Sequence, residues 1–195
     1  MITKIQFKYG SMNSGKSLEL IKIAYNFKEN NIDTLILKPK IDTRKANKVF
    51  SRANLEVDAV EISESDYEDT LKKIVDKIGN AKVIMVDESN FLSEKSVDAI
   101  IDYAYEHKLN AVMFFGLKVD FRGNLFEGTK RIIERADKIE ESTSICWCGK
   151  KARQNARVVN NKIIKTGETV VIDDDVDKVT YISLCNYHYY KEELS

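Results

Sequence analysis

The sequence predicts an α/β fold in which helices cover both faces of a parallel sheet, followed by a smaller β-rich part. Segments with the period of a strand alternate with segments of helical period over about the first 140 residues. The runs at residues 83–86 and 111–115 are continuously apolar, as in strands buried on both faces. Beyond residue 140 the pattern changes to short β-like pieces that contain all of the cysteines.

The first predicted strand, at residues 2–9, leads directly into Gly10. A helix is predicted after it, because Leu18, Ile21 and Tyr25 fall on one face at helical spacing. The short apolar run at residues 34–37 predicts the next strand. The chain's only proline follows this run, which indicates that the strand ends there.

The next segments predict a loop, a strand and a helix. Residues 40–54 are polar and irregular, which indicates a loop, whereas residues 55–62 alternate between apolar and polar as a strand does. Ser63, with Asp66 three residues later, has the pattern of a helix N-cap. The apolar residues that follow repeat at helical spacing over residues 67–78.

Two strands and two helices complete the predicted sheet. Residues 83–86 are the first of the two strands, and Ser93 is the predicted cap of the helix after it. Residues 111–115 are the second strand, and a helix is predicted near residues 128–137 after a glycine-containing loop. We expect a domain boundary near residue 140, which separates residues 1–140 from residues 141–195.

Composition excludes several classes of protein. The 31 basic and 31 acidic residues give a net charge of zero, which argues against a dedicated nucleic-acid-binding protein. No apolar run is long enough to cross a bilayer, and the first residues lack the pattern of a signal peptide, so we expect a cytoplasmic protein without a membrane partner. An odd number of cysteines, Cys146, Cys148 and Cys185, argues against a disulfide framework and favours metal binding.

Residues 10–17 match the phosphate-loop pattern G-x-x-x-x-G-K-[ST] in full. Glycines let consecutive N–H groups turn toward phosphate oxygens, and the helix that follows adds its positive end. In such a loop the lysine reaches the β- and γ-phosphates and the last hydroxyl binds Mg²⁺. A chance match in a glycine-containing turn is the alternative, but the position between a strand and a helix argues against it. The predicted ATP contacts are Gly10, Ser11, Met12, Asn13, Ser14, Gly15, Lys16 and Ser17, the last also binding Mg²⁺.

Asp87 and Glu88 directly follow the apolar strand at residues 83–86. The carboxyl ends of parallel strands meet at the edge of a sheet where ligands bind. Successive residues point in opposite directions, so Asp87 is predicted to hold Mg²⁺ while Glu88 faces an acceptor group. The alternative is a pair of acids at a solvated strand end, which we would prefer if the phosphate loop were absent.

Three segments together resemble the cytosolic thymidine kinases of the zinc-containing, P-loop type (type II). They are the phosphate loop, Asp87-Glu88-Ser89-Asn90-Phe91 and Phe115-Gly116-Leu117-Lys118-Val119-Asp120-Phe121-Arg122-Gly123. The ending Cys-x-Cys-Gly…Tyr-x-x-x-Cys-x-x-His is similar to the small zinc domain of that family. The resemblance implies ATP-dependent phosphorylation of the 5′-hydroxyl of thymidine or deoxyuridine in nucleotide salvage. It also implies a homotetramer with feedback binding of thymidine triphosphate, and no nucleic-acid partner.

The resemblance also implies roles for individual residues around the phosphates. Glu88 takes the proton from the nucleoside 5′-hydroxyl, and Asp87 supports Mg²⁺. Asp42 and Arg44 match the family's Asp-x-Arg near the metal and phosphates.

For the nucleoside, the resemblance places Leu117, Phe121 and Tyr181 around the base and Arg122 in the same loop, without an assigned role. The segment that reads the base edge corresponds to a substrate lasso loop that includes Val171 and Ile172. Residues 172–177, Ile-Asp-Asp-Asp-Val-Asp, depart from the family's Ile-Gly-(Gly/Ala) and lie further from Tyr181. These acids are either an insertion in a solvated turn or a change in thymine selectivity.

The predicted structural zinc site combines Cys146, Cys148, Cys185 and His188 in a zinc-ribbon-like domain. A Cys₃His set can form a closed tetrahedral site, and the Cys185–His188 spacing is common at zinc. Only Trp147 separates the first two cysteines, whereas the family has Cys-x-x-Cys. The alternative is a set of reduced thiols packed as small apolar groups beside an exposed histidine.

Three other functions compete with the thymidine kinase hypothesis. The first is a P-loop ATPase or GTPase switch, although the chain lacks the guanine-reading Asn/Thr-Lys-x-Asp motif. The second is a nucleoside kinase with a different base specificity. The third is a zinc-bearing nucleic-acid-binding module, which the neutral charge disfavours.

Overall fold

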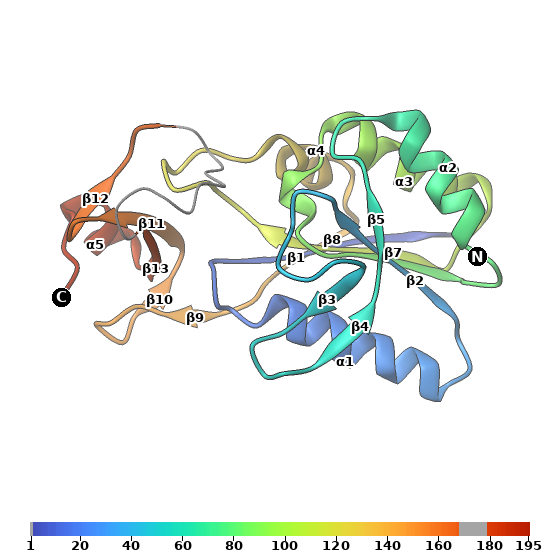
Figure 1. Cartoon of the computed structure of the whole chain (residues 1–195), viewed down its shortest axis with the longest axis horizontal. Helices are drawn as coiled ribbons and strands as arrows, with labels where there is room; N and C mark the ends of the chain where they lie inside the picture. Colours follow the sequence, from blue (N-terminus) through green and yellow to red (C-terminus); the bar gives the residue numbers. More distant parts are fainter. Residues whose placement is uncertain (1, 168–178) are drawn as a thin grey trace.

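A computed structural model describes residues 2–167 and 179–195 of the chain. Its centre is a six-stranded sheet with the strand order β5-β2-β6-β7-β1-β8, and every pairing in this sheet is parallel (Figure 1). The six strands are β1 (Lys4–Gly10), β2 (Thr34–Pro39), β5 (Val60–Ile62), β6 (Val83–Val86), β7 (Ala111–Leu117) and β8 (Lys138–Glu141). The predicted fold class is confirmed.

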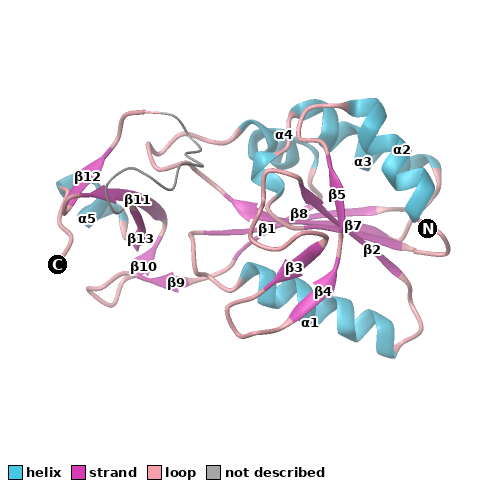
Figure 2. Ribbon diagram, in the orientation of Figure 1, coloured by secondary structure: helices cyan, strands magenta, loops and turns pink. Residues whose placement is uncertain are grey.

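Helices cover both faces of this sheet (Figure 2). One face carries α1 (Lys16–Glu29), and the other carries α2 (Tyr67–Lys77), α3 (Glu94–Glu106) and α4 (Glu127–Arg135). Strand β6 shows why its sequence is continuously apolar: its alternate residues belong to two different apolar clusters, one on each side of the sheet. No helix in the described part of the chain has both the length and the apolar character that crossing a membrane requires.

The predicted strand at residues 55–62 divides into two strands of different sheets. Its first part is β4 (Glu56–Asp58), which pairs antiparallel with β3 (Lys48–Phe50). Its second part is β5, which pairs parallel with β2. Strand β3 lies within the segment predicted as a loop, so both predictions need correction. The alternating pattern indicates extended backbone correctly, but pairing partners decide where a strand ends.

Helix α2 begins three residues later than the sequence pattern indicates. Its N-cap is Asp66, whose side chain accepts a hydrogen bond from Asp69 N at 3.0 Å. The prediction that Ser63 is the N-cap of this helix is therefore wrong. Ser93 does cap α3, because its hydroxyl accepts a hydrogen bond from Ser96 N at 3.3 Å.

Helix α1 packs on the sheet through Leu20, Ile21 and Ala24. Leu18 and Tyr25, which share helical spacing with Ile21, are instead exposed. The spacing identifies the helix correctly, but the buried face is rotated from the predicted one.

The remainder of the chain forms a small unit with its own apolar cluster. Two short sheets make it up, the pair β9 (Ser144–Ile145) and β10 (Lys151–Ala152) and the three strands β11 (Gln154–Val159), β12 (Lys162–Ile164) and β13 (Thr180–Leu184). Helix α5 (Asn186–Lys191) follows them. Figure 1 shows this unit beside the carboxyl ends of the main strands. The main sheet ends with β8 and the small unit begins with β9, whereas the division at residue 140 into two domains stays a prediction.

Candidate active site and cysteine–histidine cluster

The loop between β1 and α1 is tightly curled. Asn13 and Gly15 adopt left-handed backbone conformations, with φ of 63° and 82°. Gly10 has no room for a side chain, since an added Cβ would lie 2.3 Å from Ser14 Oγ and 2.7 Å from the carbonyl oxygen of Ser142. The glycines of the motif are therefore required by the path of the backbone at these two positions.

Lys16 opens α1 and points back into the loop. Its ammonium group donates hydrogen bonds to Ser11 O at 2.9 Å and to Ser14 Oγ at 3.4 Å. The side chain is buried, and this burial lowers the pKa of Lys16 more than the charges of Glu88 and Asp87 raise it. An anion in the loop would give this partly desolvated cation a counter-charge.

Asp87 meets the loop from the end of β6. Ser17 Oγ donates to Asp87 Oδ2 at 2.9 Å, and within the described residues Asp87 Oδ1 is buried without a hydrogen-bond partner. Burial is the main cause that raises the pKa of Asp87 to about 7, with a further contribution from the charge of Glu88. A buried carboxylate oxygen with an unused lone pair, beside a hydroxyl, is a donor set that suits a hard cation.

Glu88 lies at the turn that follows β6 and precedes the short helix η1 (Ser89–Phe91). Its backbone is left-handed, with φ of 47°, which is unusual for a residue with a long side chain. The Arg44 guanidinium donates to Glu88 Oε1 at 2.6 Å and to both carboxylate oxygens of Asp42, at 2.7 and 3.1 Å. Asp42 also pairs at 3.1 Å with Lys38, which is fully buried. This chain of charges holds Arg44 and Glu88 toward the phosphate loop.

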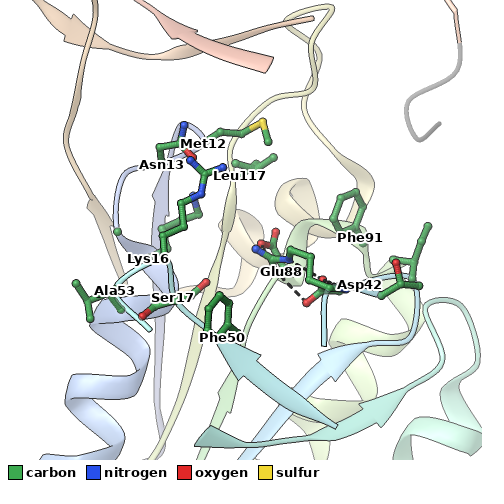
Figure 3. Close-up of a pocket in the computed structure, with 17 residues that line it drawn as sticks. Met12, Asn13, Lys16, Ser17, Asp42, Phe50, Ala53, Glu88, Phe91 and Leu117 are labelled. Carbon is green, nitrogen blue, oxygen red and sulfur yellow. Dashed lines mark hydrogen bonds and ion pairs between the residues drawn. The ribbon is translucent and has the colours of Figure 1, made fainter. Parts of the chain in front are cut away.

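Lys16, Ser17, Asp42, Arg44 and Glu88 line one pocket of about 400 Å³. Figure 3 shows Lys16 and Ser17 on one side of it, with Glu88 and Asp42 facing them from the other. Of the residues predicted as site residues, those that line it are Met12, Asn13, Gly15, Lys16, Ser17, Asp42, Arg44, Glu88 and Leu117. The pocket therefore brings together the phosphate loop, Glu88 and the Asp-x-Arg segment after β2. Gly10, Ser11, Ser14 and the buried Asp87 were also predicted as site residues but do not line it, and Asp87 is joined to the loop through Ser17.

Sequence reasoning missed several of the pocket's residues. The rings of Phe50 and Phe91 line it, as does Arg52. Phe91 ends the segment that starts at Asp87, so its position in that motif was an available signal. Phe50 and Arg52 lie at and just after β3, inside the segment predicted as a loop, where no local pattern indicates a pocket wall.

Asn90 is another residue that sequence reasoning did not assign. It is buried, and its Oδ1 accepts a hydrogen bond from Leu117 N at 2.9 Å. The contact ties the end of β7 to η1 and thereby fixes Leu117 at the pocket. Gly116 leaves space for this contact, because an added Cβ would lie 3.0 Å from Asn90 Oδ1.

Phe121, Arg122 and Tyr181 do not line this pocket in the described part of the chain. Phe121 is buried, and the Arg122 and Arg157 guanidinium groups lie 5.7 and 5.3 Å from its ring centre. Arg122 pairs with Asp120 at 2.7 Å. Tyr181 lies on β13 opposite Arg157. Val171 and Ile172 lie outside the described residues, so the predicted lasso loop stays a prediction.

Cys146, Cys148, Cys185 and His188 form a compact cluster in the small unit, with all four candidate ligand atoms within 4.8 Å of one another. His188 Nδ1 lies 3.4 Å from Cys146 Sγ and 3.5 Å from Cys185 Sγ, and the sulfur atoms of Cys148 and Cys185 are 3.9 Å apart. A turn closes the short Cys-x-Cys spacing, because Gly149 N donates to Cys146 O at 2.9 Å with Gly149 in the left-handed region. The cluster could hold a metal ion.

The electrostatics of the cluster favour a thiolate. Burial alone would raise the pKa of the Cys146 thiol, but hydrogen bonds from the backbone of Cys148 and Cys185 and from His188 lower that pKa to about 6. Trp147, the residue between the first two cysteines, stacks on the His188 ring with centres 4.1 Å apart. Glu193 lies 3.6 Å from His188 Nε2, on the side opposite the sulfur atoms. A carboxylate behind a ligating histidine is a common second layer of metal sites.

Comparisons with known proteins agree with this arrangement. A family model described as thymidine kinase matches residues 3–189. A thymidine kinase of Lactococcus lactis is 39% identical over 201 residues, covering 99% of this chain and 100% of that protein. Thymidine kinases of Lactiplantibacillus plantarum and Rhodopirellula baltica are 37% and 36% identical, and the matches cover 97% and 96% of this chain and 96% and 88% of those proteins.

Proposed function

The chain belongs to the thymidine kinase family, and we propose that it transfers the γ-phosphoryl group of ATP to the 5′-hydroxyl of thymidine in nucleotide salvage. The single observation that carries this proposal is that the phosphate loop faces Glu88 across one pocket and bonds to Asp87 through Ser17, in a chain that matches this family over nearly its full length. Deoxyuridine is the second substrate that we expect.

The triphosphate and Mg²⁺ would bind at the phosphate loop. Lys16 already points into the curl of the loop and would pair with the β- and γ-phosphates. Ser17 and Asp87 would hold Mg²⁺, and the unpartnered Asp87 Oδ1 supports this assignment. Bound Mg²⁺ supplies positive charge where negative charge develops during phosphoryl transfer.

Glu88 is the proposed general base. It would accept the proton of the nucleoside 5′-hydroxyl as that oxygen attacks the γ-phosphorus. Its contact with Arg44 keeps the carboxylate at the pocket and also brings a fixed positive charge close to the reacting phosphate. Asp42 holds Arg44 by two hydrogen bonds, so we assign it a supporting role.

Leu117 is the described residue that we assign to the nucleoside side of the pocket. We also propose Phe121 and Tyr181 for the base on the family's pattern, although neither lines the pocket in the described residues. Arg122 is assigned a structural role, because its guanidinium pairs with Asp120 in the same loop.

The metal of the cysteine–histidine cluster is proposed to be zinc with a structural role. A tetrahedral zinc ion with bonds of about 2.3 Å to sulfur and about 2.0 Å to nitrogen requires S–S and S–N separations of roughly 3.8 and 3.5 Å. Three separations, 3.9 Å between the sulfur atoms of Cys148 and Cys185 and 3.4 and 3.5 Å from His188 to two sulfur atoms, fit this geometry, and all four ligand atoms lie within 4.8 Å of one another. The residues leave no open position for a substrate, which favours a structural site.

Three further properties of the family are proposed for this chain. We expect a homotetramer, feedback binding of thymidine triphosphate at the active site, and a cytoplasmic location. Size-exclusion chromatography with light scattering tests the first, and inhibition that thymidine relieves competitively tests the second.

The test of the main proposal is a substrate panel. The purified protein is incubated with Mg²⁺–ATP and single nucleosides, and the products are identified by mass. The proposal requires thymidine monophosphate together with ADP formation that depends on the added nucleoside. ADP formation of equal rate without any nucleoside would instead indicate an ATPase, and phosphorylation of another nucleoside alone would indicate a changed base specificity.

A further inference from the structure

Side chains of the small unit hold the backbone of the phosphate loop at Met12. Met12 N donates a hydrogen bond to Asn155 Oδ1 at 2.6 Å, and Ser183 Oγ donates to Met12 O at 2.7 Å. Both polar backbone groups of one loop residue are thus bound by side chains that follow it by 143 and 171 positions in the sequence. Neither residue belongs to the phosphate-loop motif or to the acids after β6.

The two side chains form a matched pair on neighbouring strands. Asn155 of β11 and Ser183 of β13 are directly opposite in the antiparallel register, so their side chains lie on the same face of the small sheet. Asn155 is buried, and its Nδ2 donates to Val119 O at 3.2 Å in the segment after β7. Its amide therefore joins the phosphate loop to a third part of the chain, with both ends of the amide used.

Met12 is a residue at which hydrogen bonds can fix the backbone conformation of the phosphate loop. It lines the pocket, and the next residue, Asn13, has the left-handed backbone that turns the loop inward. Its own N–H points toward Asn155 and is bonded there, so it does not compete for a phosphate oxygen inside the loop. If both bonds were lost, the partly buried N–H and carbonyl groups of Met12 would lose their protein partners, and the backbone of the loop would no longer be fixed at this residue.

From this arrangement we infer that Asn155 and Ser183 are positioning residues that hold the phosphate loop in its ATP-binding conformation. The inference rests on the proposed function only in taking ATP as the ligand. It gives the small unit a role in nucleotide binding, because both side chains that bond to Met12 belong to that unit. Ser183 also lies two residues before Cys185 of the cluster. Figure 1 shows β13, the strand that carries Ser183, beside α5, the helix that carries His188.

The test compares four variants. Asn155→Ala removes the acceptor for Met12 N and the donor to Val119 O, Ser183→Ala removes only the donor to Met12 O, and Asn155→Asp keeps the acceptor for Met12 N. The matched control is Val158→Ala on the same strand, a buried apolar residue of the small unit that makes no bond to the loop. Binding of Mg²⁺–ATP is measured by calorimetry without a nucleoside, and KM for ATP, KM for thymidine, kcat and Tm are measured in parallel.

We expect Asn155→Ala to weaken ATP binding about tenfold and Ser183→Ala to weaken it about threefold, because each change removes a hydrogen bond that fixes the loop. KM for ATP should rise with the dissociation constant, while KM for thymidine changes little. Asn155→Asp should also weaken ATP binding, because its buried carboxylate faces Val119 O and adds a negative charge near the loop. Val158→Ala should lower Tm without changing ATP affinity. If Asn155→Ala does not fold, Ser183→Ala against Val158→Ala decides the question.

Wild-type ATP affinity in the folded Asn155→Ala and Ser183→Ala variants would overturn the inference, as would an equal loss in Val158→Ala. The calorimetry separates this result from the proposed function. A wild-type chain that binds Mg²⁺–ATP but phosphorylates no nucleoside would overturn the function alone. A wild-type chain that binds no Mg²⁺–ATP would overturn both.

Discussion

The pocket at the phosphate loop and the cysteine–histidine cluster relate in opposite ways to the stability of their surroundings. The two apolar clusters of the main sheet do not include the charged residues of the pocket. At this site Asp87 has a buried carboxylate oxygen without a hydrogen-bond partner in the described residues, and Glu88 has a left-handed backbone. In the small unit, Cys146 and Cys185 are themselves members of the apolar cluster. The comparison indicates that the first site costs stability, whereas the second supplies it once a metal ion is bound.

Metal removal is the strongest way to break this comparison. Structural zinc contributes about 10–16 kcal/mol to the folding of zinc-finger peptides, so we expect chelation to abolish tertiary packing in the small unit while the main sheet persists. Trp147 is the chain's only tryptophan and stacks on His188, so its fluorescence reports the change while far-UV circular dichroism follows the sheet. Added zinc should restore the signal. Protein that contains no metal as purified, with fluorescence insensitive to chelator and zinc, would contradict the prediction.

Glu88→Gln tests whether the residue with this left-handed backbone acts as the general base in phosphoryl transfer. Loss of a general base lowers turnover by about 10²–10⁴-fold, whereas ATP binding should be nearly unchanged because the phosphate loop is intact. Turnover and calorimetric ATP binding are the measurements. Glu134→Gln, on the surface of α4, is the control and should match wild type in both. Near-normal turnover in Glu88→Gln would exclude Glu88 as the base.

Asp87→Asn tests the stability cost directly. Because burial raises the pKa of Asp87 to about 7, the neutral amide should stabilise the metal-free protein, by on the order of 2 kcal/mol, while Mg²⁺-dependent activity is lost. Urea unfolding without Mg²⁺ at neutral pH measures the first effect. Asp120→Asn is the matched control, since this buried aspartate pairs with Arg122 and its neutralisation should destabilise the protein. The same sign in both variants would contradict the interpretation.

The N-cap of α2 tests how much a local hydrogen bond away from both sites contributes to the stability of the main unit. Asp66→Ala should destabilise the protein by about 1 kcal/mol, because Asp69 N loses its acceptor at the start of α2. Ser63→Ala is the control and should stay within about 0.5 kcal/mol of wild type, since Ser63 lies outside the helix. Urea unfolding of both variants measures the difference. A larger loss in Ser63→Ala would restore Ser63 as the cap.

The smallest expected effect is an acid dependence at the β3–β4 hairpin. Hydrogen bonds from Lys45 and Lys48 lower the pKa of Glu56 to about 2, below its ordinary value. A lowered pKa in the folded state means that Glu56 contributes stability above the unfolded-state pKa and loses it as the pH falls through the folded-state pKa. The stability difference between wild type and Glu56→Gln should therefore be largest above about pH 5 and vanish near pH 2. A difference that grows on acidification would contradict the assignment.

Local sequence was sufficient where one short segment carries both the structure and the chemistry. The apolar run of β6 predicted a strand buried on both faces, and the alternation of its residues between two clusters explains why. The phosphate loop and the acids after β6 were predicted to converge because the carboxyl ends of parallel strands share one edge. The Cys₃His set was predicted as a cluster from the resemblance of the ending to a zinc domain and from the Cys-x-x-His spacing, and its four candidate ligands do lie together.

The sequence by itself determined the fold class, the phosphate loop, the acidic pair and the four clustered ligands, because each depends on spacing within a segment or on a rule about strand ends. Only the tertiary structure decided that residues 55–62 divide between two sheets, that Phe50 walls the pocket and that Phe121 lies away from it. It alone revealed that Asn155 and Ser183 hold Met12. The physical reason is that such contacts join residues far apart in the chain, and their partners follow from packing that no local period records.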